Sequence, residues 1–323
     1  MTRGLVIGKF MPIHAGHIAM IRYAASLCDE LIVSMSFTPD DPIDGALRFS
    51  WLTEILSSIS HVKAFMIPDD FDNPALPLET RTQRWAEEMR NIYPPIDLIV
   101  SSETYGEPFA QHLNARHVSF DPERVNTPVS ATQIRNQPFR YWEFIPSVVR
   151  PWFVKNICIY GPESTGKSTL AIRMAAHFNT EFVPEVAREM LINNDFSIDE
   201  IIRIGVGQTE RVIEKMKSAN KLLFCDTDLI TTQIYSQHYL GIVPEILEKL
   251  EARVKYDHYF LLQHDTPWIA DGLRDLGHRR DEMYNTFKQA LDKRNITYTV
   301  VSGDWEERER LVTRIIERLY FTV

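Results

Sequence analysis

The sequence of 323 residues contains only three cysteines, and they form no recognisable site. Cys28, Cys158 and Cys225 lie far apart in the chain, and no two of them make a CxxC pair. This spacing argues against a zinc site and against a framework of disulfides. The cysteine content is therefore typical of a protein from a reducing compartment.

A surplus of basic residues is also missing. The chain has 35 Lys and Arg against 44 Asp and Glu, which gives a formal net charge of -9 and a pI near 5.6. A general nucleic-acid-binding protein needs a basic face that neutralises backbone phosphates. The charge argues against that class, although it allows local basic pockets.

Long hydrophobic runs are absent near the start of the chain. In MTRGLVIGKFM, one arginine is followed by only five residues before Lys9, too few for the core of a signal peptide or for a membrane span. The 13 glycines and 18 prolines are dispersed and form no low-complexity segment. We expect a globular protein of the cytoplasm with no membrane association.

The length and the hydrophobic pattern predict two domains of the α/β class. Short β-branched runs alternate with segments of helical period, which is typical of parallel sheets covered by helices. Strands are expected at residues 5–7, 30–37, 62–67, 97–102, 116–120, 156–161, 222–226, 258–263 and 297–302. We predict two doubly wound parallel-sheet domains, residues 1–137 and 154–323, joined by residues 138–153. This junction is rich in aromatic residues and proline, so we expect it to pack rather than to act as a flexible linker.

The strongest motif is GPESTGKST at residues 161–169, between an expected strand and an expected helix. This order is the setting of a phosphate-binding P-loop. Two glycines allow the backbone to wrap around phosphates, Lys167 can reach the terminal phosphates and Ser168 can bind Mg²⁺. The predicted ATP-binding residues are Gly161, Pro162, Glu163, Ser164, Thr165, Gly166, Ser168 and Thr169, with Lys167 catalytic. A chance glycine-rich turn is the alternative.

Acidic residues in the second half are candidates for metal binding and proton transfer. LLFCDTD places Asp226 and Asp228 at the carboxyl end of a buried strand, where ligands of doubly wound sheets gather. Asp226 is the better candidate for Mg²⁺, and Asp228 could instead cap the next helix. Glu185 and Arg188 lie one helical turn apart just after another strand. Glu185 could accept a proton from a substrate hydroxyl and Arg188 could contact the substrate, or the two could form a surface ion pair.

A run of arginines follows in DGLRDLGHRRDEM, residues 271–283. Arg274, Arg279 and Arg280 are expected on a loop between a strand and a helix. Arginines on a closing lid stabilise the charge of a phosphoryl group in transfer, so Arg274 and Arg279 are candidate ATP contacts. A solvated run of charges is the alternative.

A second phosphate-handling motif, GKFMPIHAGH, occupies residues 8–17 between an expected strand and an expected helix. His14 and His17 would lie one turn apart at a helix N-terminus, where their ring N–H groups can bind the α- and β-phosphates of a nucleotide. Gly16 would allow close approach. Further ATP contacts are predicted at Gly8, Lys9 and Phe10. By spacing alone, the two histidines could equally be metal ligands or surface residues.

Two later segments of the first half extend this prediction. SATQIR matches the S-x-T-x-x-R signature that accompanies H-x-G-H in the nucleotidyltransferase superfamily. Ser130 and Thr132 can donate to phosphate oxygens and Arg135 can neutralise the leaving pyrophosphate, while a helix cap with an exposed arginine is the alternative. SSETYGEPF follows a later strand, and its candidate substrate contacts are Ser101, Ser102, Glu103 and Tyr105. A backbone turn at TYG explains part of that pattern.

Taken together, these motifs resemble those of the bifunctional nicotinamide-mononucleotide adenylyltransferase and ribosylnicotinamide kinase family, the NadR type. The resemblance covers essentially the whole chain and includes PFRYWEFIPSVVRP, VPEVARE, CDTD and DGLR. It implies a Rossmann-like nucleotidyltransferase domain followed by a P-loop kinase. It also implies ATP as substrate, Mg²⁺ as cofactor, and nicotinamide riboside, nicotinamide mononucleotide and NAD as further ligands. A homo-oligomer is possible.

The resemblance also implies catalytic roles for a small set of residues, namely His14, His17, Arg135, Lys167, Glu185 and Asp226. Some members of the family carry an N-terminal helix-turn-helix that makes them repressors. Here the first expected strand begins within five residues of Met1, so we expect no such domain and no binding to DNA.

Two other functions fit the same motifs. A fused pantetheine-phosphate adenylyltransferase and dephospho-coenzyme A kinase would also join an H-x-G-H domain to a P-loop, and SSETYGEP with the aromatic junction favours the nicotinamide function over it. A non-catalytic nucleotide sensor would lack catalytic side chains. Because Lys167, Ser168, Asp226 and the paired histidines are present, the sequence favours an enzyme.

Overall fold

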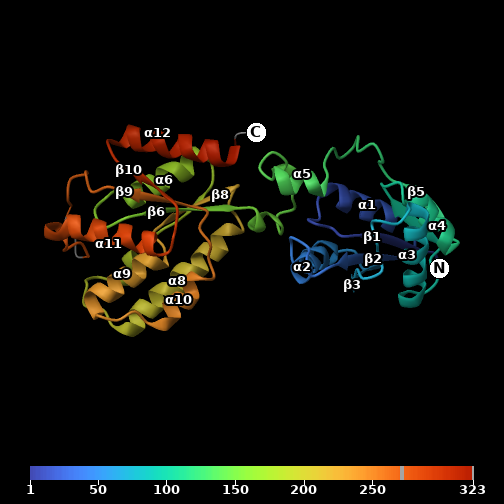
Figure 1. Cartoon of the computed structure of the whole chain (residues 1–323), viewed down its shortest axis with the longest axis horizontal. Coiled ribbons are helices and arrows are strands. Elements are labelled where there is room, and N and C mark those ends of the chain that lie inside the picture. The colour runs from blue at the N-terminus through green and yellow to red at the C-terminus, as the bar shows by residue number, and fades with distance from the viewer. Residues whose placement is uncertain (270–272, 322–323) are drawn as a thin grey trace. The chain divides into compact units, whose positions relative to one another are not determined.

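The computed structural model describes residues 1–269 and 273–321, which form two compact units, Met1–Arg150 and Pro151–Val323 (Figure 1). The boundary falls inside the aromatic segment 138–153. In that segment Phe139, Trp142 and Val149 are buried, and two short 3-10 helices form at Trp142–Phe144 and Arg150–Trp152. Among the described helices, none has the length and apolar character needed to cross a membrane.

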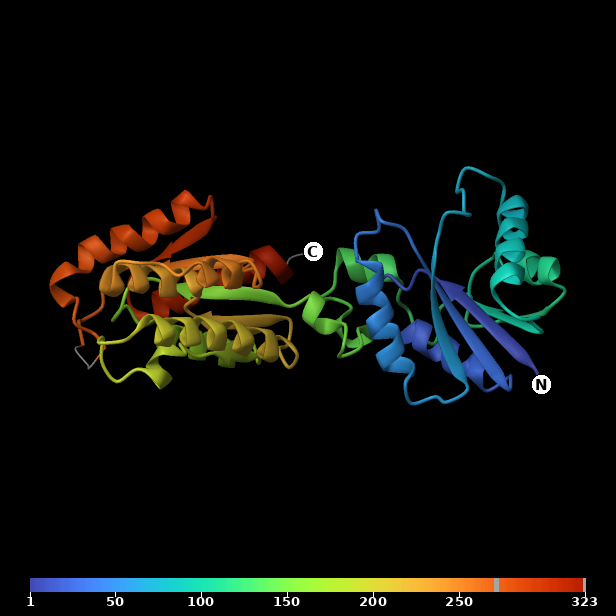
Figure 2. The same ribbon diagram turned by 90° about the horizontal axis from the view of Figure 1, so that it is seen from below.

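The first unit is built on a sheet of five parallel strands in the order β3-β2-β1-β4-β5 (Figure 2). Its strands are β1 (Arg3–Gly8), β2 (Glu30–Phe37), β3 (Val62–Pro68), β4 (Leu98–Ser101) and β5 (Arg116–Ser119). Its helices are α1 (Ala15–Ala25), α2 (Gly45–Leu56), α3 (Leu78–Ile92), α4 (Gly106–Leu113) and α5 (Ala131–Asn136). The chain moves outward from β1 to β3 and then returns to the other side of β1. The carboxyl ends of β1 and β4 therefore flank a topological switch point, where such sheets bind ligands.

The second unit repeats this plan with five parallel strands in the order β10-β9-β6-β8-β7. Its strands are β6 (Lys155–Tyr160), β7 (Glu181–Val183), β8 (Leu222–Asp226), β9 (His258–Leu262) and β10 (Tyr298–Val301). Its helices are α6 (Lys167–His177), α7 (Ala187–Met190), α8 (Ile198–Met216), α9 (Leu229–Leu240), α10 (Glu245–Glu251), α11 (Arg280–Lys293) and α12 (Trp305–Ile316). Short turns of 3-10 and π type occupy Gly277–Arg279 and Glu317–Phe321. The α/β prediction with two parallel sheets is confirmed.

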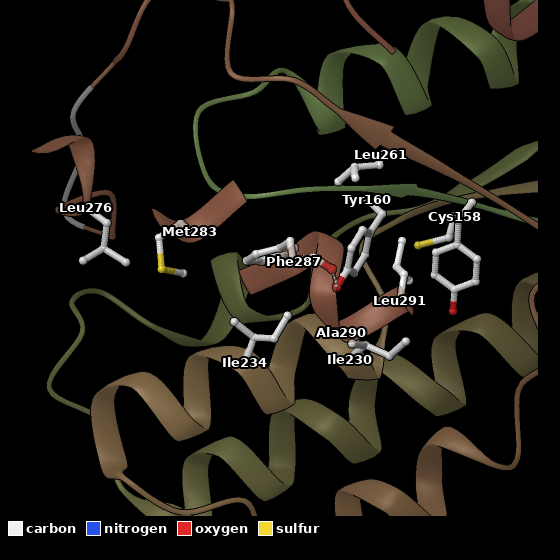
Figure 3. Packing of buried hydrophobic residues seen from close by; sticks show 11 residues of the cluster. Cys158, Tyr160, Ile230, Ile234, Leu261, Leu276, Met283, Phe287, Ala290 and Leu291 are labelled. Carbon is white, nitrogen blue, oxygen red and sulfur yellow. Dashed lines mark hydrogen bonds between the residues drawn. The ribbon is translucent and has the colours of Figure 1, made fainter. Parts of the chain in front are cut away.

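The burial of the strands explains their composition. The central strands β4, β6 and β8 are buried at nearly every position, so apolar residues fill their interiors without a polar residue at every second position. The edge strand β3 leaves Phe65 and Met66 exposed. In the second unit, α9 and α11 pack on β6 and β9 through a core cluster that includes Ile230, Phe287 and Leu291 (Figure 3). The hydroxyl of Tyr160 donates to the carbonyl of Phe287 at 3.2 Å, which fixes the end of β6.

Candidate active sites

The P-loop of the second unit connects β6 to α6 and depends on both of its glycines. Gly161 has φ +142 and Gly166 has φ +89, which are conformations that residues with a Cβ rarely adopt. A Cβ on Gly166 would also lie 2.6 Å from the Trp305 ring. Lys167 is 6% exposed, and its Nζ donates to the carbonyl of Pro162 at 2.9 Å, so the side chain folds back over the loop. A small cavity lined by residues 164–169 together with Arg188 and Arg274 opens at this loop.

Asp226 ends the neighbouring strand β8, opposite Ile159 of β6. Burial, followed by the nearby Glu185, raises the pKa of Asp226, while Lys167 and a hydrogen bond from Ser168 lower it. Its Oδ1 atom is buried and has no hydrogen-bond partner among the described residues. A buried carboxylate oxygen without a partner, next to a hydroxyl, fits a hard cation such as Mg²⁺. Residues 1–269 and 273–321 contain no group of three or more His, Cys, Asp or Glu that could hold a metal, so Mg²⁺ here would need phosphate or water ligands as well.

Of the two interpretations of Asp228, a ligand at the strand end or a helix cap, the structure shows the helix cap. It caps α9, where its side chain accepts from the backbone N–H of Thr231 at 2.9 Å and from the hydroxyl of Tyr259 at 2.9 Å. Burial raises the pKa of Asp228 to about 6. With both carboxylate oxygens engaged, Asp228 is a helix cap and not a ligand of the site.

A cavity with about 670 Å³ of space adjoins the P-loop, and it contains the predicted acid and arginine. Nε of Arg188 donates to Oε2 of Glu185 at 2.9 Å, and the Glu185 side chain is only 13% exposed. The ion pair therefore lines a cavity together with Lys167 and does not lie on an open surface.

Sequence reasoning missed other residues of this cavity. Gln208 of α8 is 2% exposed, and its Oε1 accepts from the N–H of Val186 at 2.9 Å. This bond fixes the orientation of the amide, and Nε2 has no partner in the described part of the chain. Asn194 and Tyr239 also line the cavity, and the Asn194 amide donates to the Tyr239 hydroxyl at 3.0 Å. Gln208 and Tyr239 lie in helices and Asn194 lies in the loop between α7 and α8, and no motif marks any of the three.

The arginines after β9 differ in their surroundings. Arg274 lines the phosphate cavity, and Nη2 of Arg280 donates to the carbonyl of Ser164 at 3.4 Å. Arg279 instead pairs with Glu282 one turn along α11, with Nε to Oε2 at 2.7 Å, and it lines a groove between α9 and α11. The structure thus gives Arg279 a helix ion pair in place of the predicted ATP contact. Asp271 and Gly272 of the DGLR motif lie outside the described residues.

In the first unit, the two histidines lie together at the start of α1. His14 is the N-cap residue, and its Nδ1 accepts from the N–H of Gly16 at 3.1 Å. The rings of His14 and His17 lie 3.8 Å apart, and Phe10 packs edge-on against His17 at 5.1 Å. Phe10 is 2% exposed, so it supports the His17 ring and does not itself offer a surface to ATP.

Both histidines are neutral at physiological pH. Burial, together with the nearby Arg124, lowers the pKa of His14 to about 4. Burial, then His14 and Arg124, lowers the pKa of His17 well below its ordinary value. Because Nδ1 of His14 accepts a hydrogen bond, the proton of its neutral ring is on Nε2. The sequence left the charge of these rings open, and the structure makes them neutral hydrogen-bond donors.

This assignment predicts a flat NMR titration. The Cε1–H signals of His14 and His17 should not shift between about pH 8 and about pH 5.5, because the pKa of His14 is about 4. The unfolded chain binds these protons near pH 6.5, so the first unit should lose stability as the pH falls below that value. His14→Asn and His17→Asn variants would assign the two signals. A midpoint near 6.5 for either ring would contradict the neutral site.

A cavity with about 920 Å³ of space opens beside the histidines and is lined by Gly8, His14, Gly16, His17, Ser102, Glu103, Tyr105, Asp121, Arg124, Ser130 and Thr132, among others. The predicted residues Ser130 and Thr132 are thus at the cavity, and Ser130 also forms a capping box with Gln133 of α5. Arg135 donates to Thr132 Oγ1 at 3.2 Å and to the carbonyl of Met11. These bonds tie α5 to the GKFMPIHAGH loop.

The SSETYG segment contributes three of its four predicted residues to the cavities. Ser101 is the exception, since it is 1% exposed and its Oγ lies 3.0 Å from Nε2 of His117. A Cβ on Gly106 would come within 2.0 Å of that same Oγ, so the backbone closes over it. Ser101 therefore supports the end of the sheet and has no room for a substrate.

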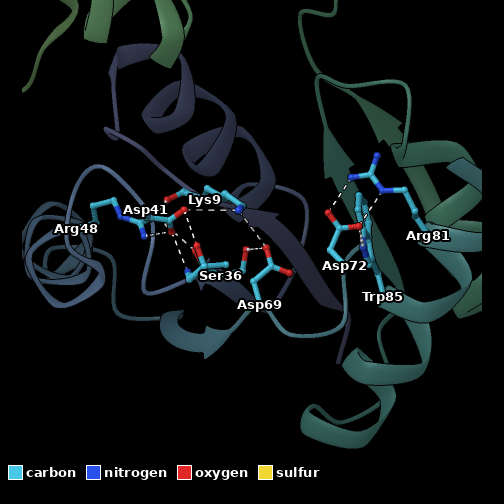
Figure 4. Close-up of polar contacts among 9 residues, drawn as sticks. Lys9, Ser36, Asp41, Arg48, Asp69, Asp72, Arg81 and Trp85 are labelled. Atoms are coloured by element: carbon cyan, nitrogen blue, oxygen red, sulfur yellow. Dashed lines mark hydrogen bonds and ion pairs between the residues drawn. The ribbon is translucent and has the colours of Figure 1, made fainter. Parts of the chain in front are cut away.

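A second cavity, with about 830 Å³ of space, is lined by residues at the ends of β1, β2 and β3 and by Asp72, Arg81 and Trp85. Figure 4 shows the polar contacts of these three side chains. Asp72 accepts from Nε and Nη2 of Arg81 at 2.8 Å each and from Nε1 of Trp85 at 3.0 Å. The Arg81 guanidinium lies 5.1 Å from the centre of the Trp85 ring. The two cavities of this unit share Ile7, Gly8, Glu103 and Tyr105, so their contents can meet at the end of β1.

Lys9 lines this second cavity and not the one beside the histidines. Its Nζ lies 3.7 Å from Asp41 and 3.4 Å from Asp69. Arg48 has no exposed side-chain surface, pairs with Asp41 at 2.6 Å and donates to the carbonyl of Lys9 (Figure 4). The buried Arg48 thus holds the backbone at Lys9, and the Lys9 side chain lines the cavity.

Comparison with known proteins places the chain in a family. A model of the AAA domain matches residues 156–308. The trifunctional NAD biosynthesis/regulator protein NadR of Escherichia coli (strain K12) is 35% identical over 338 residues, which cover 95% of this chain and 80% of that protein. Two crystal structures of NadR protein, one in complex with NR and one with NAD and AMP-PNP, match with a TM-score of 0.82 each. Each is 22% identical and covers 100% of this chain and 97% of its own, and this likeness shows the fold. From its identity to the E. coli protein over nearly its whole length, the chain belongs to the NadR family of NAD-biosynthesis enzymes.

Proposed function

We propose that this enzyme makes NAD in two consecutive steps, one in each unit. The second unit transfers the terminal phosphoryl group of ATP to nicotinamide riboside, which gives nicotinamide mononucleotide and ADP. The first unit joins the mononucleotide to AMP from a second ATP, which gives NAD and pyrophosphate. One observation carries the proposal: at its own switch point, each sheet has a glycine-containing loop that leads into a helix, with one cavity at the loop and a second cavity next to it.

For the kinase step, the riboside occupies the cavity next to Lys167. A ribose hydroxyl oxygen attacks the terminal phosphorus of ATP. The bond between this phosphorus and the bridging oxygen breaks, and ADP leaves. Glu185 lines that cavity and accepts the hydroxyl proton, which a ribose hydroxyl otherwise keeps at neutral pH. Ser168 and Asp226 would hold Mg²⁺, which neutralises phosphate charge when bound. Lys167 and the loop N–H groups hold the terminal phosphates.

The riboside also offers a hydrogen-bond acceptor to the unpaired Nε2 of Gln208. A buried donor without a partner destabilises the folded chain, and a bound ligand that offers an acceptor removes that cost. Nε2 of Gln208 is fixed in this position because Oε1 is held by the N–H of Val186. An oxygen of the riboside is the acceptor that we assign to it.

For the adenylyl step, ATP occupies the cavity beside the histidines and the mononucleotide occupies the cavity beside Trp85. A phosphate oxygen of the mononucleotide attacks the α-phosphorus of ATP and pyrophosphate leaves. The second pKa of such a phosphate is near ~6, so at neutral pH it is mostly dianionic and needs no general base. His14 and His17 donate from neutral rings to the phosphates of ATP, and the indole of Trp85 offers a flat surface to the nicotinamide ring.

The role of Glu185 gives a prediction for the kinase alone. Glu185→Gln should lower kinase kcat by at least about tenfold, because the amide cannot accept the hydroxyl proton. Adenylyl transfer should not change. Glu189→Gln is the matched control, since Glu189 lies one turn further on and pairs with Arg211 at 2.6 Å outside the cavity. If Glu185→Gln keeps full turnover and Asp226→Asn loses it without weakening the Mg²⁺ requirement, Asp226 is the base.

The whole function is tested by incubating the purified chain with ATP, Mg²⁺ and nicotinamide riboside and separating the products over time. We expect nicotinamide mononucleotide first and NAD later. Parallel reactions with dephospho-coenzyme A and with pantetheine phosphate test the alternative pair of activities. Turnover of those substrates in place of the riboside would overturn the proposal, and binding of nucleotide without any turnover would indicate a sensor.

A further inference from the structure

Helix α12 contains an arginine that the proposed mechanism does not use. The Arg308 side chain has no exposed surface. Its Nη1 donates to the carbonyl of Thr165 at 2.8 Å, its Nε donates to the carbonyl of Gly303 at 2.8 Å, and its Nη2 pairs with Asp265. Asp265 is held in turn, because it accepts from the N–H of Gly303 at 2.7 Å. One guanidinium thus joins the P-loop, the turn before α12 and the segment after β9.

The contact with Thr165 has a direct consequence for the P-loop. A P-loop binds phosphate through its backbone N–H groups. Because a peptide is planar and trans, its N–H and C=O point in opposite directions. The carbonyl of Thr165 belongs to the same peptide as the N–H of Gly166, so a donor that holds this carbonyl also sets the direction of that N–H.

A second contact from α12 restrains the same peptide. The Trp305 ring lies so close to Gly166 that a Cβ there would be 2.6 Å from it. Gly166 has φ +89, a conformation that glycine reaches easily and also leaves easily. Trp305 limits the space behind Gly166, and Arg308 fixes the carbonyl before it. Both contacts therefore restrain the Thr165–Gly166 peptide.

We propose that Arg308 is a positioning residue for phosphoryl transfer. It acts through the Thr165–Gly166 peptide, whose N–H it directs toward the phosphates of ATP, and it does not touch ATP itself. The proposal rests on the kinase assignment for the second unit. It assigns to α12, which contains none of the predicted catalytic residues, a part in the kinase reaction.

The test compares Arg308→Ala and Arg308→Lys with Arg310→Ala, which alters an exposed arginine on the same helix. Kinase kcat and KM are measured for ATP and for the riboside, with adenylyl transfer and thermal unfolding measured on the same samples. Arg308→Ala should lose at least about tenfold in kcat/KM for ATP while the riboside KM stays within about twofold, because the change is confined to the phosphate loop. Arg308→Lys should recover only part of the loss, since one ammonium cannot replace the planar fork of donors.

Added guanidinium ion distinguishes positioning from a loss of stability. In Arg308→Ala, a free guanidinium can enter the space left by the side chain, so kinase activity should rise at millimolar concentrations that do not change wild-type activity. Kinetics for ATP equal to those of Arg310→Ala would overturn the proposal. So would loss of the second unit's unfolding transition in both Arg308 variants, since Arg308 would then serve the fold.

Failure of the proposed function gives a different result. If the wild-type chain does not phosphorylate the riboside, the kinase assignment fails, but ATP affinity still tests Arg308. Calorimetry on the wild type and on Lys167→Ala identifies the ATP binding that depends on the P-loop, because Lys167→Ala loses it. Arg308→Ala should weaken this same P-loop-dependent binding of ATP. If its affinity is unchanged in Arg308→Ala, the positioning role is overturned.

Discussion

Replacing Lys167 by alanine should reduce riboside phosphorylation by about 10³-fold while NAD formation from added nicotinamide mononucleotide continues at the wild-type rate. Lys167 is 6% exposed and lies over the P-loop, with its Nζ on the carbonyl of Pro162 at 2.9 Å. In the proposed kinase step, the ammonium group reaches the terminal phosphates of ATP from this position. Without it, the charge that develops on the transferred phosphoryl group loses its main cation from the protein.

The measurement is a pair of initial-rate assays on one preparation, the first with riboside and ATP and the second with mononucleotide and ATP. Lys217→Ala serves as the control, because Lys217 is an exposed lysine near the end of α8. Circular dichroism shows whether the variant is folded. Loss of both activities in a folded Lys167→Ala protein would mean that the two sites are not independent.

His17→Ala should have the reverse effect and lower adenylyl transfer by about 10²–10³-fold, the usual result of removing one donor to a developing charge. The His17 ring lies against His14 with its centre 3.8 Å away, and both rings are neutral donors at the histidine cavity. Riboside phosphorylation should continue unchanged, because the P-loop belongs to the other unit.

For this variant the product that matters is NAD formed from mononucleotide, with mononucleotide formed from riboside as the internal reference. His177→Ala is the matched control, since it removes an exposed histidine from the second unit. A His17→Ala protein that still makes NAD at more than about a tenth of the wild-type rate would remove His17 from the mechanism.

The sequence predicted the sheets well because their central strands are buried on both faces. Runs such as LIV in β4 and LLFC in β8 are apolar at every position up to the polar residue that ends each strand, so they stand out from the amphipathic helices around them. Strand β7 has only three residues; a strand was expected just before Glu185, but so short a run did not give its bounds. The phosphate loops were also predictable, because their glycines and their basic side chains lie within about ten residues of one another.

The remainder of each site could not be predicted in this way, because its residues come together only in the folded chain. Gln208 meets Val186 across 22 residues, and Arg308 meets Thr165 across 143. Trp85 and Asp72 belong to the second cavity through a hydrogen bond between a loop and α3. Conversely, proximity in sequence was misleading for Phe10, Ser101 and Arg279, whose side chains pack or pair away from the cavities that their neighbours line.

The long separation between Thr165 and Arg308 also bears on synthesis at the ribosome. The residues that line the cavities of the first unit all precede residue 136, and this unit is compact within residues 1–150, so it can fold while the rest is being translated. The P-loop, by contrast, emerges 143 residues before the arginine that holds it. A nascent chain should therefore gain the ability to bind nucleotide at its histidines well before its second nucleotide loop is fixed, and the kinase should be the later of the two activities to mature.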